Sequence, residues 1–140
     1  MSKDVMVGFR FNSDVDFEAI LDHLETIGWT CLRDGVVMYM VDDYDWKDLP
    51  PDRIGNARRE IRRSYDAGEV VALSMKLPGE EIYGNLVFHA DRSSVSFIPL
   101  LDYRVITGAP RWVDLSWYIE RLATSLEDFT LTGITASDEL

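Results

Sequence analysis

Three short apolar segments follow one another in the middle of the chain, and a turn-forming sequence separates each from the next. The segments are residues 70–75, 82–89 and 95–101, and the turns are Leu-Pro-Gly-Glu at 77–80 and Asp-Arg-Ser-Ser at 91–94. Connections this short join antiparallel neighbours, because a parallel crossover needs a dozen or more residues. The sequence therefore predicts an antiparallel meander at the centre of the fold.

The start of the chain predicts a strand followed by a helix. Apolar residues alternate with other residues from 5 to 11, which is the period of a half-buried strand. Ser13, with Asp16 three positions later, is typical of a helix N-terminus, and Gly28 is typical of a left-handed C-cap. The apolar positions between them have helical spacing: Phe17, Ile20, Leu21, Leu24 and Ile27.

Turn residues and periodicity predict the next two elements. The Asp-Gly pair at 34–35 lies between apolar runs at 29–32 and 36–41, which indicates a tight hairpin. A second helix is predicted over 52–67, because Pro51 is tolerated near a helix start and Gly68 follows its last apolar position.

The C-terminal part predicts a loop over 102–111, a third helix over 113–126 and an edge strand over 129–135. Hairpins then outnumber crossovers along the chain. This order favours an α+β fold, a mostly antiparallel sheet of about five or six strands with three helices, in a single domain of residues 1–140. The predicted core positions are Val7, Phe9, Ile20, Leu24, Met38, Ile61, Leu73, Phe88, Phe97, Ile119 and Leu122.

The charge of the chain restricts its partners. Its 14 Lys and Arg residues against 25 Asp and Glu residues give a net charge of −11. Such a surface disfavours nucleic acids and anionic membranes, which need cationic side chains, whereas it suits a basic protein. Acidity also maintains solubility without any partner. Cys31 is the single cysteine, and no signal peptide or apolar membrane span is apparent, so we expect a cytoplasmic protein of the bacterial-cytosol type.

No group of residues has the spacing of a known catalytic or metal centre. His23 and His89 belong to different elements, and Ser93 and Ser94 lack the Gly-x-Ser-x-Gly context of an activated nucleophile. Cys31 lies in an apolar run and is expected to be an inert thiol. The Asp-Asp-Tyr-Asp sequence at 42–45 lacks the alternating ligands, central Gly and closing Glu of a calcium loop. We therefore predict no enzyme activity, no bound metal and no cofactor.

The acidic segment 42–52 is the predicted binding surface. It carries five Asp against one Lys, with Tyr and Trp among them. Exposed aromatic residues often anchor binding hot spots, while surrounding charges set orientation and association rate. The alternative is that the Trp folds back onto the domain. A weaker candidate of the same kind comprises Asp102, Tyr103 and Trp112. The predicted partner-binding residues are Asp42, Asp43, Tyr44, Asp45, Trp46 and Asp48.

The second predicted helix carries the chain's basic ridge, residues 58–63. Arg58 and Arg62 are neighbours on the helix surface, as are Arg59 and Arg63. The ridge either contacts a phosphate or a nucleic acid, or it pairs with acidic residues of the segment 42–52, internally or across a dimer. Pairing is favoured, because no aromatic residues are interleaved with it and the rest of the molecule repels polyanions.

The chain resembles the immunity proteins of bacterial polymorphic-toxin and contact-dependent growth-inhibition systems. The resemblance rests on the small acidic α+β domain, the meander 70–101, the acidic aromatic segment 42–46 and the acidic helix 14–25. These families share no residue motif, so the resemblance assigns no individual residue. It implies an immunity-type inhibitor that blocks a basic toxin domain, in many cases a nuclease. The alternatives are a metabolite-binding module that uses the ridge Arg58–Arg63 and a regulatory homo-oligomer.

Overall fold

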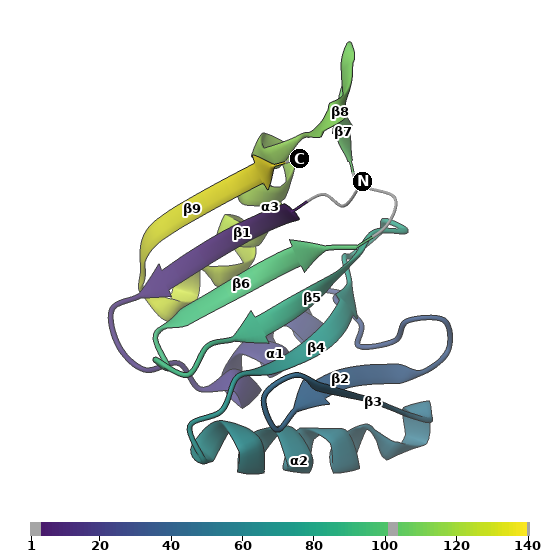
Figure 1. Cartoon of the computed structure of the whole chain (residues 1–140), viewed down its shortest axis with the longest axis vertical. Coiled ribbons are helices and arrows are strands. Elements are labelled where there is room, and N and C mark those ends of the chain that lie inside the picture. Colours follow the sequence, from purple (N-terminus) through teal and green to yellow (C-terminus); the bar gives the residue numbers. More distant parts are fainter. Residues whose placement is uncertain (1–3, 101–103, 140) are drawn as a thin grey trace.

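The computed structural model describes residues 4–100 and 104–139, and it confirms the predicted α+β fold. In this part of the chain seven strands form one antiparallel sheet in the order β3-β2-β4-β5-β6-β1-β9 (Figure 1). Two further strands form a separate hairpin. The strands of the sheet are β1 (Asp4–Phe11), β2 (Val37–Val41), β3 (Asp45–Leu49), β4 (Val71–Lys76), β5 (Tyr83–Phe88), β6 (Ser94–Pro99) and β9 (Leu131–Glu139).

Three helices in the described residues cover one face of the sheet. They are α1 (Phe17–Thr26), α2 (Ile54–Asp66) and α3 (Leu115–Leu126). In Figure 1, α1 and α3 lie behind the sheet and α2 runs along its β2–β3 end. Buried residues of all three helices join the same core cluster. The opposite face of the sheet carries no helix in the described part of the chain, and we call it the helix-free face.

The first helix starts later than predicted. Its N-cap is Asp16, whose Oδ1 accepts a hydrogen bond from the Glu18 N–H at 3.0 Å, so Ser13 is not the cap. The reason lies just before the helix, where the N–H of the buried Val15 donates to the Arg92 carbonyl at 2.6 Å. This bond holds the connection in an extended path. Ile27 is the C-cap residue and 42% exposed, so its predicted place in the apolar stripe is wrong.

The Asp-Gly turn forms, but the long hairpin predicted around it does not. Arg33 and Val36 exchange backbone hydrogen bonds of 2.9 and 3.1 Å, and Asp34 and Gly35 have φ values of 52° and 79°. However, residues 29–32 are not a strand. The two neighbours of β2 are instead β3 and β4, so no side of β2 is left for residues 29–32.

Two segments expected to be irregular are strands. The acidic segment contributes β3 and then a short 3₁₀ helix, Pro51–Arg53. The expected loop 102–111 contains β7 (Val105–Ile106) and the start of β8 (Ala109–Val113). The predicted edge strand is confirmed as β9, which extends to Glu139. The predicted sheet of five or six strands is therefore too small.

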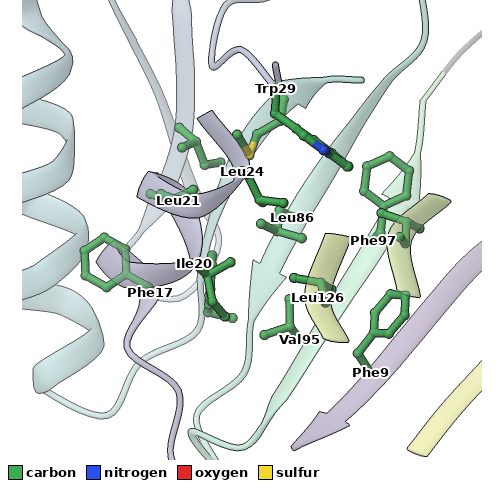
Figure 2. Close-up of a cluster of buried hydrophobic side chains, with 14 of the residues drawn as sticks. Phe9, Phe17, Ile20, Leu21, Leu24, Trp29, Leu86, Val95, Phe97 and Leu126 are labelled. Atoms are coloured by element: carbon green, nitrogen blue, oxygen red, sulfur yellow. The ribbon is translucent and has the colours of Figure 1, made fainter. Parts of the chain in front are cut away.

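The core lies between the sheet and the helices (Figure 2). Nine predicted core positions are buried there, and Ile119 packs against it half-buried. Met38 is the error: Val37, Tyr39 and Val41 point into the core, so the alternation of the strand turns Met38 to the helix-free face. Aromatic rings pack edge to face in the core, including Trp29 against Phe97 with centroids 6.0 Å apart.

Candidate functional site

The structure brings all six predicted binding residues together on one hairpin. We call β2, β3 and the turn between them the acidic hairpin. Asp42, Asp43 and Tyr44 form the turn, with φ values of 50°, 49° and 78°. Three consecutive non-glycine residues in the left-handed region are costly for the backbone, although Asp tolerates it better than most residues. Such a turn persists only where its surroundings hold it.

Two of the turn residues provide that support. The Asp42 N–H donates to the Ser64 Oγ at 2.9 Å, and the Asp43 Oδ1 accepts from the Val70 N–H at 2.8 Å. The Arg63 guanidinium lies 4.0 Å from the Asp42 carboxylate. Asp42 and Asp43 therefore attach the turn to α2 and to the start of β4. Tyr44, at the tip, has 73% of its surface exposed.

The remaining predicted residues lie on the edge strand β3. Trp46 is opposite Met40 in the register, so its side chain lies on the helix-free face. It is 42% exposed and does not enter the core. Asp45 and Asp48 are exposed and form no ion pair with any residue that the structure describes. The hairpin thus presents two exposed aromatic side chains and two carboxylates that have no ion pair in the described residues. Asp48 shares the helix-free face with Trp46, whereas Asp45, opposite Val41, lies on the other face.

Trp46 is the first of a row of residues that lie directly opposite one another on neighbouring strands. This row crosses the helix-free face from β3 to β9. Met40, Ala72 and Val87 form a small apolar cluster on this face, separate from the main core. Beyond them the side chains become small, and the surface is hollowed by about 260 Å³ above Gly8. The row, in sheet order, is Trp46, Met40, Ala72, Val87, Ser96, Gly8 and Thr135.

The same face carries one contact that the sequence did not indicate. The Nε2 of His89, directly after β5, and the Oγ of Ser96 on β6 lie 2.7 Å apart, a pairing that depends on strand register. This is the distance of a nucleophile and its base, but no side chain in the described residues hydrogen-bonds the other ring nitrogen. Asp91 instead accepts hydrogen bonds from Ser93 and Ser94. Burial by itself would raise the pKa of Asp91, yet these hydrogen bonds hold it below its usual value.

The basic ridge is occupied by internal ion pairs. Arg58 contacts Asp22 at 2.8 Å and Glu25 at 3.5 Å. Arg62 contacts Asp16 at 2.8 Å, and it also approaches Glu18 and Asp66. The partners therefore come mainly from α1, whereas Arg63 is the one ridge arginine that pairs with the acidic segment in the described part of the chain. These pairs neutralise much of the α1 surface, so the acidic hairpin is the stronger source of negative potential.

A pocket of about 620 Å³, lined mostly by polar and charged residues, opens between β3 and α2. The Tyr39 hydroxyl donates to Glu60, and the Lys47 Nζ lies 3.4 Å from the same carboxylate. The hydrogen bond from Tyr39 lowers the pKa of Glu60, while burial and then Glu60 raise the pKa of Tyr39. Arg59 lines the pocket and donates to Asn56 at 2.6 Å. These contacts join the edge strand to the helix.

Other predicted candidates are structural or lie elsewhere. Burial raises the pKa of Cys31 to about 12, and its Sγ donates to Glu25 at 3.4 Å, which is the environment of an unreactive thiol. In residues 4–100 and 104–139 no group of three His, Cys, Asp or Glu side chains is placed to hold a metal. Trp112 is on β8 and 38% exposed, whereas Asp102 and Tyr103 lie outside the described residues.

Comparison with family models, with curated proteins and with solved structures found no match to this chain. No helix among the described residues is long and apolar enough to cross a membrane.

Proposed function

We propose that this protein is an immunity-type inhibitor that binds a basic protein, such as a toxin domain, through the acidic hairpin. One observation carries the proposal: the hairpin displays Tyr44 and Trp46 together with the carboxylates of Asp45 and Asp48, which form no ion pair within the described residues. Other acidic residues, on α1 and at its N-cap, are paired with arginines. The binding role needs no catalytic group, and it is compatible with the bacterial cytosol.

The two kinds of residue have different tasks in this proposal. The carboxylates attract a basic surface before contact, which can raise association from about 10⁵–10⁶ to 10⁸ M⁻¹s⁻¹ at low salt. The aromatic side chains lose water on contact and hold the complex together, so that truncating a true anchor costs about 2 kcal/mol or more. The hydrogen bonds of Asp42 and Asp43 hold the turn in place before binding, which lowers the entropy cost of association.

The experiment compares charge and anchor variants against one partner. That partner is captured from host cells with the tagged chain, identified and purified, and then measured by surface plasmon resonance at several salt concentrations. The charge variant is Asp45→Asn with Asp48→Asn, and it leaves Asp42 and Asp43 intact because they hold the turn. Glu120→Gln with Glu127→Gln is the matched control, since both residues are exposed on or beside α3.

We expect the charge variant to slow association and to weaken its salt dependence, with dissociation little changed. Trp46→Ala should speed dissociation, and a loss of about 2 kcal/mol corresponds to roughly thirtyfold in Kd. The α3 control should bind like the parent. If Trp46→Ala and the charge variant both bind like the parent, the acidic hairpin is not the interface.

A second candidate function is the binding of a small polar ligand in the pocket between β3 and α2. The observation that favours it is the combination of Lys47, Arg59 and Glu60 around a pocket of about 620 Å³. A thermal-shift screen of phosphorylated metabolites tests it, because a ligand at a hundred times its Kd adds about 2.7 kcal/mol of stability. A shift that Arg59→Ala abolishes would support this function, and its absence across the screen would argue against it.

A further inference from the structure

The strand β9 forms the edge of the sheet opposite the acidic hairpin. It pairs with β1 on one side, and no strand in the described residues pairs with its other side (Figure 1). Its central residues are open to solvent, and Ile134 is 40% exposed. The outer backbone groups of β9 are therefore available to another strand.

The direction in which the backbone groups of β9 point follows from the hydrogen bonds of the neighbouring strand β1. The Phe11 N–H donates to the Ser93 carbonyl, so the backbone of Phe11 faces β6. Because directions alternate along a strand, the backbone of Gly8 faces β9 and that of its partner Thr135 faces β1. Ile134 and Ala136, on either side of Thr135, consequently direct their N–H and C=O groups outward.

The two edges of the sheet are protected to different degrees. At the other edge, β3 is only Asp45–Leu49, carries Asp45, Lys47 and Asp48, and is followed by Pro50. Shortness, charge and proline are the usual defences of an edge strand against pairing. The segment 131–137 of β9 has no charged residue and no proline. The edge formed by β9 lacks these defences. An edge strand without them is expected to pair with another strand.

We propose that two copies of this chain pair through β9, antiparallel about a two-fold axis at Thr135, and join their sheets into one. In this register Ile134 of one copy and Ala136 of the other exchange hydrogen bonds through their outward groups. The two Thr135 residues lie directly opposite each other as a non-hydrogen-bonded pair, with their side chains on the helix-free face. This alternation agrees with the outward directions derived above.

The carboxylates at the end of β9 do not block a second copy as the occupant. The acidic residues at the end of β9 are placed at opposite ends of the symmetric pair. Two Asp138 residues are then about 20 Å apart along the strands, from a rise of roughly 3.4 Å per residue. This distance exceeds the Debye length of about 8 Å at physiological salt. In addition, the Asp138 Oδ2 accepts from the Val113 N–H at 2.6 Å, which keeps this carboxylate on the helix side of the sheet.

This dimer does not depend on the proposed inhibitor function. The acidic hairpin lies at the opposite edge of the sheet, so each copy keeps its hairpin free and the dimer presents two of them. The two interactions also respond oppositely to salt. Added salt screens the repulsion between two chains of charge −11 and strengthens the dimer, whereas it weakens the binding of a basic partner.

A disulfide-trapping experiment tests the register directly. At the axis the two Cα atoms of Thr135 are about 4.5 Å apart, within the roughly 4.4–6.8 Å that a disulfide spans. Thr135→Cys should therefore form a covalent dimer under mild oxidation. Ser137→Cys is the matched control on the same face, because its two copies are about 14 Å apart. The native Cys31 is buried and should not interfere.

Sedimentation velocity tests the dimer without oxidation. The parent, a chain of 16.0 kDa, should sediment as a dimer that strengthens with salt. Ala136→Pro removes an outward donor without affecting the bonds to β1, and Ala136→Lys adds a charge to the edge, so both should be monomeric. Thr107→Lys, at the exposed β7–β8 turn, makes the same charge change and should remain dimeric.

Monomeric parent protein at the highest concentration tested would overturn the proposal. Equal cross-linking of Thr135→Cys and Ser137→Cys would overturn the register, as would dimers of both Ala136 variants. Circular dichroism and thermal melts of each variant show whether the monomers are folded. If Ala136→Pro proves unfolded, the comparison of Ala136→Lys with Thr107→Lys decides the result.

Discussion

Replacing Gly84 with alanine should destabilise the protein through a single contact in the core. A Cβ at position 84 would lie 2.1 Å from the Phe97 Cζ, and two more ring atoms lie within 2.7 Å. The Phe97 ring therefore rests directly on the backbone of β5. It is fully buried and cannot move freely, because its centroid is 6.0 Å from that of Trp29 and 6.1 Å from that of Tyr118.

The size of the effect follows from two opposing terms. Adding a methyl group to a filled core costs about 1–3 kcal/mol, and a ring held on two sides favours the upper part of that range. Alanine is favoured over glycine in a strand by roughly 0.5–1 kcal/mol, which partly offsets the cost. We expect Gly84→Ala to lower the free energy of unfolding by about 2 kcal/mol, which lowers the Tm by roughly 4–8 °C.

Urea unfolding of four variants tests this reasoning: Gly84→Ala, Phe97→Leu, the combination of the two, and Gly55→Ala. Gly55→Ala is the matched control, because the nearest atom to its added Cβ is the flexible Arg59 Nη1 at 3.8 Å. This variant should raise the free energy of unfolding by up to about 1 kcal/mol. Combining Gly84→Ala with Phe97→Leu should cost less than the sum of the two single changes by at least about 0.5 kcal/mol. A neutral Gly84→Ala, or strict additivity, would show that the ring does not rest on Gly84.

Three further predictions concern stability. Asp43→Ala should cost about 1–3 kcal/mol in urea unfolding, since it leaves the Val70 N–H without its acceptor and strains the turn; an unchanged midpoint would contradict the role of the turn. Tyr65→Phe should cost about 1 kcal/mol, because the Tyr65 hydroxyl donates to the Val15 carbonyl at 3.1 Å inside the core, where burial raises the pKa of the tyrosine to about 12. Burial raises the pKa of Asp16, but the hydrogen bond and charge of Arg62 and the hydrogen bonds from the Glu18 and Ala19 N–H groups outweigh it, so the pKa is lowered in the folded protein. The unfolded chain therefore binds the proton more readily, and the stabilisation is present above the unfolded pKa near 4 and lost as pH falls through the folded value. Asp16→Asn should flatten this acid limb of the stability curve, and an equally steep limb in the variant would refute the assignment.

Local patterns were sufficient for much of the fold. The alternation in β1, the meander β4–β5–β6 and the apolar face of α1 depend on neighbours along the chain, and the sequence predicts all three. The six predicted binding residues also lie together on one hairpin, as expected for residues within seven positions of the sequence. Their structural roles differ in a way that no local pattern indicates: Asp42 and Asp43 bond to Ser64 and Val70, which are more than twenty positions away.

The sequence by itself determined the fold class, because the periods of its apolar residues and its turn-forming residues act over a few positions. It also determined the acidic character of the surface. The tertiary structure alone decided that the acidic segment becomes the edge strand β3, since an Asp-Trp-Lys-Asp-Leu sequence pairs only where β2 offers a free side. It likewise decided that Arg58 and Arg62 bind α1 and that His89 meets Ser96. Each of these contacts joins different elements, and their distances depend on how the helices and strands pack rather than on spacing along the chain.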